Sequence, residues 1–115
     1  MHRYKRSVRV ADLIRQEVAD IIQYRLKDPR VGFVTVTEVK ISDDLKHGSV
    51  YISILNRETQ DETLKILNAS AGFVRSELGK RVRLRYTPQL VFRIDELVEQ
   101  GAKIDRLLNK IKNEE

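Results

Sequence analysis

The spacing of hydrophobic residues predicts three helical regions in this chain. In the first region, apolar residues recur three or four positions apart and would form one buried face: Val10, Leu13, Ile14, Val18, Ile21 and Ile22. Pro29 disfavours helical geometry at the residue before it, so this helix should end near Leu26. A second helical region begins at Glu62, and a third, amphipathic one extends from Leu97 to Ile111.

Three further segments alternate apolar and polar residues and predict strands: Gly32–Ile41, Ser49–Leu55 and Gln89–Asp95. In the first of them, Val34 and Val36 share one face, whereas Val39 falls on the other. A bulge near Glu38, or burial of both faces, would explain this shift. The order helix, strand, strand, helix, helix, strand, helix predicts an α+β domain with helices packed on one face of a small sheet.

Gly72 interrupts the second helical region. It lies within a stripe of apolar residues at helical spacing: Leu64, Leu67, Ala71, Val74 and Leu78. A glycine inside a helix costs about 1 kcal/mol relative to alanine, so we expect Gly72 to split the region into two helices, the second ending near Gly79. Such a glycine indicates a kink, the close approach of another element, or a contact made by the backbone itself. KH domains use a helix–break–helix pair to clamp a nucleic-acid backbone.

Positive charge is concentrated in two short segments of a chain whose formal net charge is +5. Residues 1–9 hold four basic groups and no acid, and residues 75–85 hold five basic groups and one acid, which leaves 13 basic against 16 acidic groups elsewhere. This concentration points to a polyanionic partner, with solvated surface charge as the alternative. Arg81, Arg83 and Arg85 could follow a phosphate backbone from one edge of an extended segment, or could protect an edge strand from pairing.

The composition argues against several other classes of protein. No cysteine is present among the 115 residues, which excludes disulfides, thiol catalysis and cysteine-based metal sites. No apolar run approaches the roughly 20 residues that span a bilayer, so we expect no membrane association. The basic N-terminus is not followed by the apolar segment of a secretion signal. We therefore expect a cytoplasmic protein.

Few residues are suited to catalysis. His47 is close in sequence to Asp43 and Asp44, but acidic residues in such a turn usually serve the turn and not a metal. Gly72 and Gly79 enclose six residues instead of the four of a phosphate-binding loop, and Arg81 stands where that loop requires Ser or Thr. We expect no enzyme activity, no metal or cofactor, and no small-molecule substrate.

Nearly the whole chain resembles the ribosome-binding factor A family. The resemblance lies in a DPR turn, in the sequence GFVRSELGKRVRLR and in the segments around them, in this order: Arg9–Ile22, Lys27–Ser42, Asp44–Leu55, Ser70–Phe92 and Asp95. It implies a type II KH-like fold, α-β-β-α-α-β, with a three-stranded sheet and a C-terminal helix. It also implies an assembly factor that binds the small (30S) ribosomal subunit and 16S rRNA, assists late maturation and 16S rRNA processing, and is linked to cold adaptation.

In that family the GxxG of ordinary KH domains is replaced by a kink of the form AxG. This chain has Ser70-Ala71-Gly72 at the matching place, so a serine occupies the first position. Serine is nearly as small as alanine, and its hydroxyl can cap the following helix or bond a helix carbonyl. A kink is therefore still expected here.

These observations predict a monomeric KH-like domain over residues 1–115, with residues 1–8 as a flexible basic arm and residues 96–115 as an amphipathic helix with a frayed tail. Phe73 is expected in the core. The residues expected to bind RNA are Arg3, Lys5, Arg6, Arg9, Ser70, Ala71, Gly72, Arg75, Lys80, Arg81, Arg83 and Arg85. Two alternatives remain open, an RNA-processing enzyme and a protein-binding adaptor that uses the sheet or the C-terminal helix.

Overall fold

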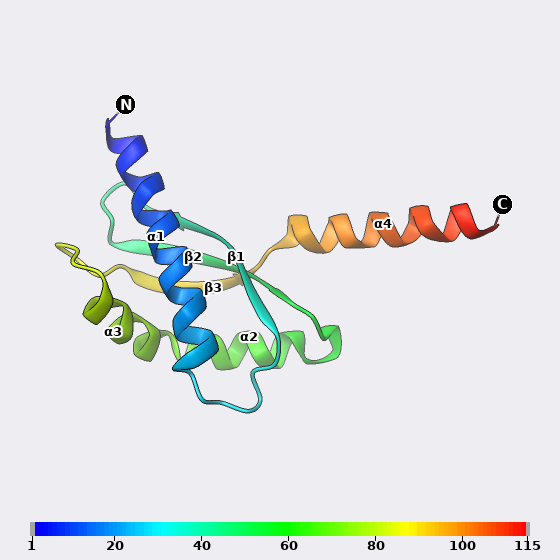
Figure 1. The fold of residues 1–115 in the computed structure, drawn as a ribbon, viewed down its shortest axis with the longest axis horizontal. Coiled ribbons are helices and arrows are strands. Elements are labelled where there is room, and N and C mark those ends of the chain that lie inside the picture. The colour runs from blue at the N-terminus through cyan, green and yellow to red at the C-terminus, as the bar shows by residue number, and fades with distance from the viewer. Residues whose placement is uncertain (1, 115) are drawn as a thin grey trace.

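The computed structural model describes the backbone of residues 2–114, and the side chains of residues 8–98 and of 101, 104–105, 107–109 and 111 (Figure 1). Its elements follow the predicted order: α1 (His2–Tyr24), β1 (Val34–Ile41), β2 (His47–Ile54), the short 3-10 helix η1 (Arg57–Thr59), α2 (Gln60–Ala69), α3 (Ala71–Arg81), β3 (Gln89–Ile94) and α4 (Glu96–Glu114). The α+β class and the α-β-β-α-α-β order with an added C-terminal helix are confirmed.

The sheet has the strand order β1-β2-β3. Strands β1 and β2 are antiparallel, and β3 lies parallel to β2 because the α2–α3 pair carries the chain back to the same end of the sheet. The register of β1 against β2 shifts between Val36 and Glu38, which confirms the predicted bulge. The extra residue, Thr37, allows Val36 and Val39 both to be buried and so explains the change of parity.

The core lies between one face of the sheet and helices α1, α2 and α3. Its fully buried side chains come from all of these elements: Ile14, Val18, Ile21, Val50, Ile52, Leu67, Val74, Leu78 and Phe92. Leu13 belongs to the predicted apolar stripe of α1 but is exposed, because the face that α1 buries is narrower than the stripe. Asn68 of α2 is tied to β3 by two bonds, since its side-chain oxygen accepts from the Phe92 N–H and its amide donates to the Phe92 carbonyl.

The helices at the two ends of the chain are longer than their predicted apolar stripes. Helix α1 begins at His2 and so includes residues 2–8, for which a flexible arm was predicted. Helix α4 continues to Glu114, through residues expected to fray, and extends away from the sheet (Figure 1). Its apolar stripe is largely exposed, with Leu97 at 77%. No helix in the described part of the chain is long and apolar enough to cross a membrane.

Asp95 connects the sheet to α4. One of its carboxylate oxygens accepts hydrogen bonds from the N–H groups of Leu97 and Val98, 3.1 and 3.2 Å away, and so caps the helix. The other oxygen accepts from the hydroxyl of Thr37, the bulge residue, at 2.6 Å. The hydrogen bond from Thr37, helped by the two N–H groups, lowers the pKa of Asp95.

Candidate nucleic-acid interface

The break between α2 and α3 is at Ser70, not at Gly72 as predicted. Ser70 has φ −93° and ψ 2°, which departs from helical geometry, and its side chain makes no capping hydrogen bond. The helical hydrogen bonds nevertheless continue across the break, since Ser70 N–H donates to the Ile66 carbonyl and Val74 N–H donates to the Ser70 carbonyl, both at 3.0 Å. The break is therefore a kink across which the helical hydrogen bonds continue from α2 to α3.

Gly72 lies in the first turn of α3, and the fold does not require a glycine there. Its φ is not positive, and a Cβ atom built on it would meet no atom within 4 Å. Two of the three interpretations of this glycine are excluded, because the kink is at Ser70 and no other element lies close to Gly72. The remaining interpretation is a contact between the exposed backbone and a ligand.

A shallow hollow lies between α3 and the loop of residues 82–88, and it is lined by Gly72, Arg75, Ser76, Gly79, Arg85, Tyr86 and Thr87. Gly79 allows the loop to approach, because a Cβ atom there would lie 3.2 Å from Thr87 Oγ1. Arg75 holds the loop in place by donating from Nε and Nη2 to the Thr87 carbonyl, at 3.1 and 2.9 Å. Two glycines and two arginines thus face one open space.

The 82–88 loop bends, whereas an extended segment was expected for its arginines. The N–H of Leu84 donates to the carbonyl of Val82, 3.2 Å away, which closes a three-residue turn around Arg83. Arg85 lies over the ring of Tyr86, 5.7 Å from its centre. Arg83 and Arg85 therefore project from a surface loop and not from the edge of a strand.

Lys46 lies next to the 82–88 loop, although no pattern in the sequence predicted it as a binding residue. Its Nζ atom lies 5.4 Å from the centre of the Tyr86 ring, so the β1–β2 turn and the 82–88 loop meet there. The turn is held by Asp44, which accepts from the Ser42 hydroxyl and from the Lys46 N–H, and the bond from Ser42 lowers the pKa of Asp44. The contact between Lys46 and Tyr86 joins residues 40 positions apart, so only the tertiary structure could reveal it.

Asp44 thus serves the turn, the role that was favoured for it from the sequence. Within the described part of the chain, no group of three His, Asp or Glu side chains is placed to hold a metal ion.

Arg81 is engaged in ion pairs between helices. Its Nη1 atom lies 2.5 Å from Asp20 Oδ2 and 3.2 Å from Glu17 Oε2, both on α1, and the hydrogen bond to Asp20 raises the pKa of the guanidinium. Lys80 lies 3.6 Å from the buried carboxylate of Glu77. The contacts of Arg81 link α3 to α1, whereas the Lys80–Glu77 pair lies within α3. Because each of these cations has a carboxylate partner, we leave Lys80 and Arg81 out of the interface.

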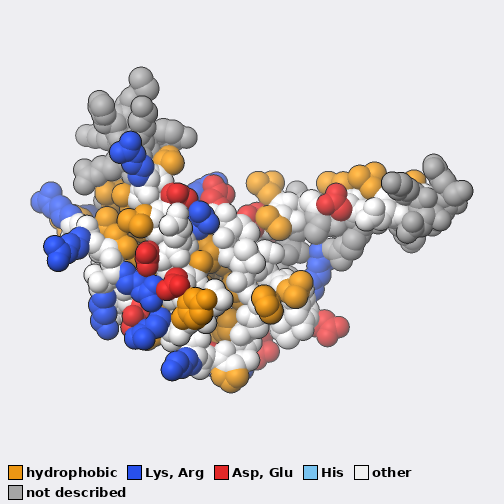
Figure 2. All heavy atoms as spheres, in the orientation of Figure 1, with side chains coloured by type: hydrophobic (Ala, Val, Ile, Leu, Met, Phe, Trp, Pro, Cys, Tyr) orange, Lys and Arg blue, Asp and Glu red, His pale blue; other side chains and the backbone are white. Residues whose placement is uncertain are grey.

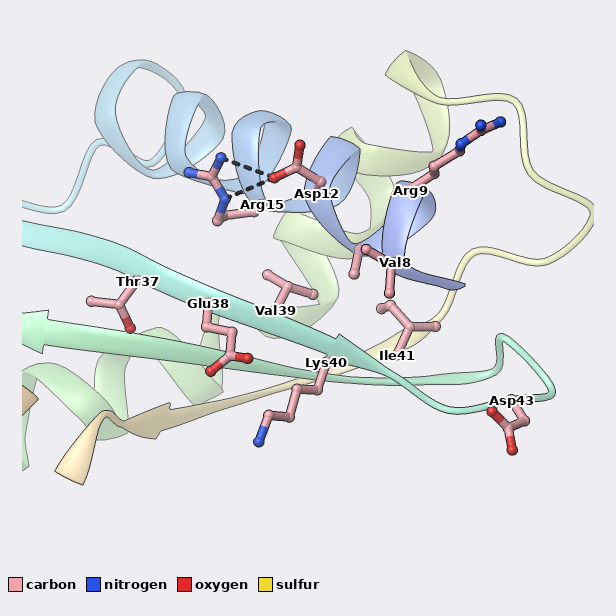
Figure 3. Close-up of a pocket in the computed structure, with 11 residues that line it drawn as sticks. Val8, Arg9, Asp12, Arg15, Thr37, Glu38, Val39, Lys40, Ile41 and Asp43 are labelled. Atoms are coloured by element: carbon pink, nitrogen blue, oxygen red, sulfur yellow. Dashed lines mark hydrogen bonds and ion pairs between the residues drawn. The ribbon is translucent and has the colours of Figure 1, made fainter. Parts of the chain in front are cut away.

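The other predicted residues are dispersed. Arg9 is exposed on α1 beside a large hollow between α1 and β1, which carries acidic as well as basic groups and in which Arg15 is paired with Asp12 (Figure 3). Arg3, Lys5 and Arg6 lie outside the residues whose side chains are described. Phe73, expected in the core, is 43% exposed next to Gly72.

Basic side chains gather at the end of the molecule formed by the 82–88 loop, on the left in Figure 2. We define the loop-end interface as the residues around the hollow and this loop: Lys46, Gly72, Arg75, Gly79, Arg83, Arg85 and Tyr86. It combines exposed cations, helix backbone that no side chain covers at Gly72, and one half-exposed aromatic ring. These are the groups that bind a phosphate chain and stack on a base.

Comparison with known proteins gives consistent matches. Residues 6–108 match the sequence model of the family described as ribosome-binding factor A. The chain is 49% identical to ribosome-binding factor A of Thermodesulfovibrio yellowstonii over 112 residues, which cover 97% of this chain and 95% of the relative.

Two solved structures extend this similarity to the fold. The crystal structure of ribosome-binding factor A from Thermus thermophilus has a TM-score of 0.70 and 30% identity, over 76% of this chain and 94% of that one. A homology model of the Thermus protein, fitted into a cryo-electron microscopy map of its complex with the 30S subunit, has a TM-score of 0.61 and 31% identity, over 72% of this chain and 88% of that one.

Proposed function

Because this chain belongs to the ribosome-binding factor A family, we propose that it is a non-enzymatic assembly factor that binds 16S rRNA within the small ribosomal subunit. The observation that carries the proposal is the loop-end interface. The Thermus relative in complex with the 30S subunit supports the choice of partner. The proposal includes a monomeric protein that acts in the cytoplasm, where subunits mature.

The geometry of the loop-end interface suits an RNA backbone. Gly72 has no side chain, and Ser76, one turn further along α3, has a small one, so a sugar–phosphate chain can approach this side of the hollow closely. Arg75, Arg85 and Lys46 supply positive charge around it, and the forked arginine guanidinium matches phosphate oxygens. Tyr86, which is half exposed, can stack on an unpaired base.

Binding of this kind acts on rRNA by shifting a conformational equilibrium. The protein favours whichever rRNA conformation it binds more tightly, by no more than the difference in affinity between the two. We propose that this difference favours the conformation from which late maturation and processing of the 16S rRNA proceed. An effect on growth in the cold follows, because misfolded rRNA escapes more slowly at low temperature.

A charge-reversed variant of the loop tests the interface. Arg83 and Arg85 are exposed and have no ion pair among the described residues, so Arg83→Glu with Arg85→Glu should leave the melting temperature unchanged. We expect the affinity for 30S subunits and for naked 16S rRNA to fall by about tenfold or more. Lys27→Glu with Lys65→Glu, an equal change at exposed sites away from the loop, is the matched control. Full affinity in the loop variant would refute the interface.

The two alternative functions give different results. An RNA-processing enzyme would cleave precursor 16S rRNA by itself, so the purified protein is incubated with that RNA with and without divalent metal. A protein-binding adaptor would sediment with assembled subunits but not with naked rRNA.

The role in maturation is tested in cells whose only copy of the gene encodes the loop variant. Accumulation of precursor 16S rRNA and slow growth in the cold in these cells would support that role.

A further inference from the structure

The face of the sheet that points away from the helices, here called the open sheet face, carries a second group of cations. Along each strand, buried residues alternate with residues on this face, which include Lys40, His47, Ser49, Tyr51, Gln89, Val91 and Arg93. The strand register places Ser49 between Lys40 and Val91 in one row, and Tyr51 next to Arg93 in the following row. Figure 3 shows Lys40 on the side of β1 opposite to α1.

A hollow lies on the open sheet face, and no carboxylate lines it. Its polar lining consists of Lys40, Ser42, His47, Ser49, Gln89 and Arg93, and the small side chain of Ser49 lies at its centre, on the middle strand. Lys40 and Arg93 are exposed, and neither forms an ion pair within the described part of the chain. Two cations with hydroxyl and amide groups between them are the kinds of group that bind phosphate oxygens.

The carboxylates beside this hollow, those of Glu38 and Asp95, do not line it. The carboxylate of Asp95 accepts from Thr37 and from two N–H groups of α4, so its hydrogen-bonding capacity is used in the fold. The Nζ atom of Lys40 lies over the ring of Tyr51, 5.4 Å from its centre. Its charge contributes to the lowered pKa of Asp95, but the two groups form no ion pair in the described part of the chain.

The hollow is continuous with the loop-end interface. β1 ends, and β2 and β3 begin, at the same end of the sheet, because β1 is antiparallel and β3 parallel to β2. His47 directly follows Lys46, and Gln89 comes just after the 82–88 loop. An RNA that contacts Lys46 and the loop therefore reaches the open sheet face by turning around this end of the molecule.

We propose that the open sheet face is a second RNA-contact surface, on which Lys40 and Arg93 hold phosphates of the rRNA bound at the loop-end interface. The inference rests on the proposed function in that it takes the same RNA as partner. RNA is favoured over an acidic protein because the hollow offers oxyanion ligands and continues a surface suited to RNA. Strands β1 and β3 are about 10 Å apart, two strand spacings, so the two cations contact different phosphates.

The first experiment neutralises the two cations and measures RNA affinity. Lys40→Gln with Arg93→Gln should weaken binding to naked 16S rRNA about tenfold, and should reduce the slope of log Kd against log salt by about 1 for each cation removed. Arg83→Gln with Arg85→Gln is measured beside it, and Lys27→Gln with Lys65→Gln is the matched control. The melting temperatures of all three should agree with that of the unsubstituted protein, because every substituted side chain is exposed.

The variants separate failure of this inference from failure of the proposed function. If the loop variant binds weakly and the sheet variant binds normally, only the open sheet face is refuted. If the loop variant also binds normally, the loop-end interface fails as well. If the control weakens binding as much as the sheet variant, the effect is one of overall charge, and the inference is wrong.

Crosslinking identifies the occupant directly. The chain has no cysteine, so Gln89→Cys creates a unique site for a thiol-linked photocrosslinker on the open sheet face. In 30S complexes we expect adducts with 16S rRNA, and few from Lys65→Cys on the exposed side of α2. Adducts with a ribosomal protein alone would overturn the inference, as would a sheet variant that loses affinity for subunits but keeps it for naked rRNA.

Discussion

Replacing Gly72 with alanine separates what the fold needs from what the interface needs. A Cβ atom at this position meets nothing within 4 Å, and the backbone has no positive φ, so alanine fits without strain. Because alanine favours a helix and glycine does not, Gly72→Ala should stabilise the protein. Most substitutions destabilise, and a stabilising change at a binding site is therefore a specific expectation.

The size of the effect follows from the position of Gly72. Glycine in a helix interior is about 1 kcal/mol less favourable than alanine, and a compatible glycine-to-alanine change stabilises by about 0.4–1 kcal/mol. Gly72 is in the first turn of α3, so we expect about 0.5 kcal/mol. In a chain of this length that raises the melting temperature by about 2–3 °C. The new methyl group adds no buried contact, so no packing gain is included.

The same methyl group should weaken RNA binding. If the sugar–phosphate chain packs against the α3 backbone at Gly72, the extra carbon costs about 1–3 kcal/mol, which is a loss of roughly fivefold to 150-fold in affinity. Thermal unfolding by circular dichroism and fluorescence anisotropy with labelled 16S rRNA fragments measure the two effects on the same preparation. Gly101→Ala in α4, also free of contacts within 4 Å, is the control for binding.

Two results would refute this reasoning. A fall in melting temperature would mean that the kink between α2 and α3 requires glycine after all. A higher melting temperature with unchanged RNA affinity would mean that RNA contacts only the cations of the loop-end interface and not the backbone of α3. Gly79→Ala provides a comparison, since its methyl group would lie 3.2 Å from Thr87 Oγ1 and its gain in stability should be smaller.

Three further predictions concern the fold. Arg81→Gln should lower the melting temperature, because it breaks the ion pairs with two carboxylates of α1, whereas Arg83→Gln with Arg85→Gln should not lower it. If Arg81→Gln and the unsubstituted protein have equal melting temperatures, these ion pairs contribute nothing to stability. Asn68→Ala removes both bonds to the Phe92 backbone and should cost about 1–3 kcal/mol in urea unfolding. The hydrogen bonds from Arg30 lower the pKa of Asp28 to about 2, so its carboxylate stabilises the fold above pH 3.8 and loses this effect as the pH falls towards 2. The difference in melting temperature between the unsubstituted protein and Asp28→Ala should therefore shrink over that interval.

Local patterns predicted most of the fold. Hydrophobic spacing located the three strands, α2, α3 and α4 within a few residues, but it missed the first turns of α1 and the short helix η1. The parity shift between Val36 and Val39 located the bulge, because side-chain direction along a strand has a period of two. The break between α2 and α3 was placed at Gly72 instead of Ser70. Glycine is the residue least suited to a helix, but it is tolerated in a first turn, whereas the departure from helical geometry falls on a serine with ordinary φ.

The candidate site was only partly predictable. The charge clusters drew attention to the arginines after α3, yet the sequence contains nothing that distinguishes Arg81 from Arg83. Their roles separate when α1 packs against α3 and brings two carboxylates to Arg81 alone. Lys46 shows the opposite case, an ordinary turn residue that tertiary contact places over Tyr86.

The sequence by itself determined the family, the order of the elements and the presence of excess positive charge near both the N-terminus and α3, since these depend on residue types and on spacings of a few positions. Only the tertiary structure decided which cations are neutralised, which glycine is left exposed, and which face of the sheet remains uncovered. Those properties depend on pairs of residues far apart in the chain, such as Glu17 with Arg81 and Lys40 with Arg93, and distance in space is not encoded in local periodicity.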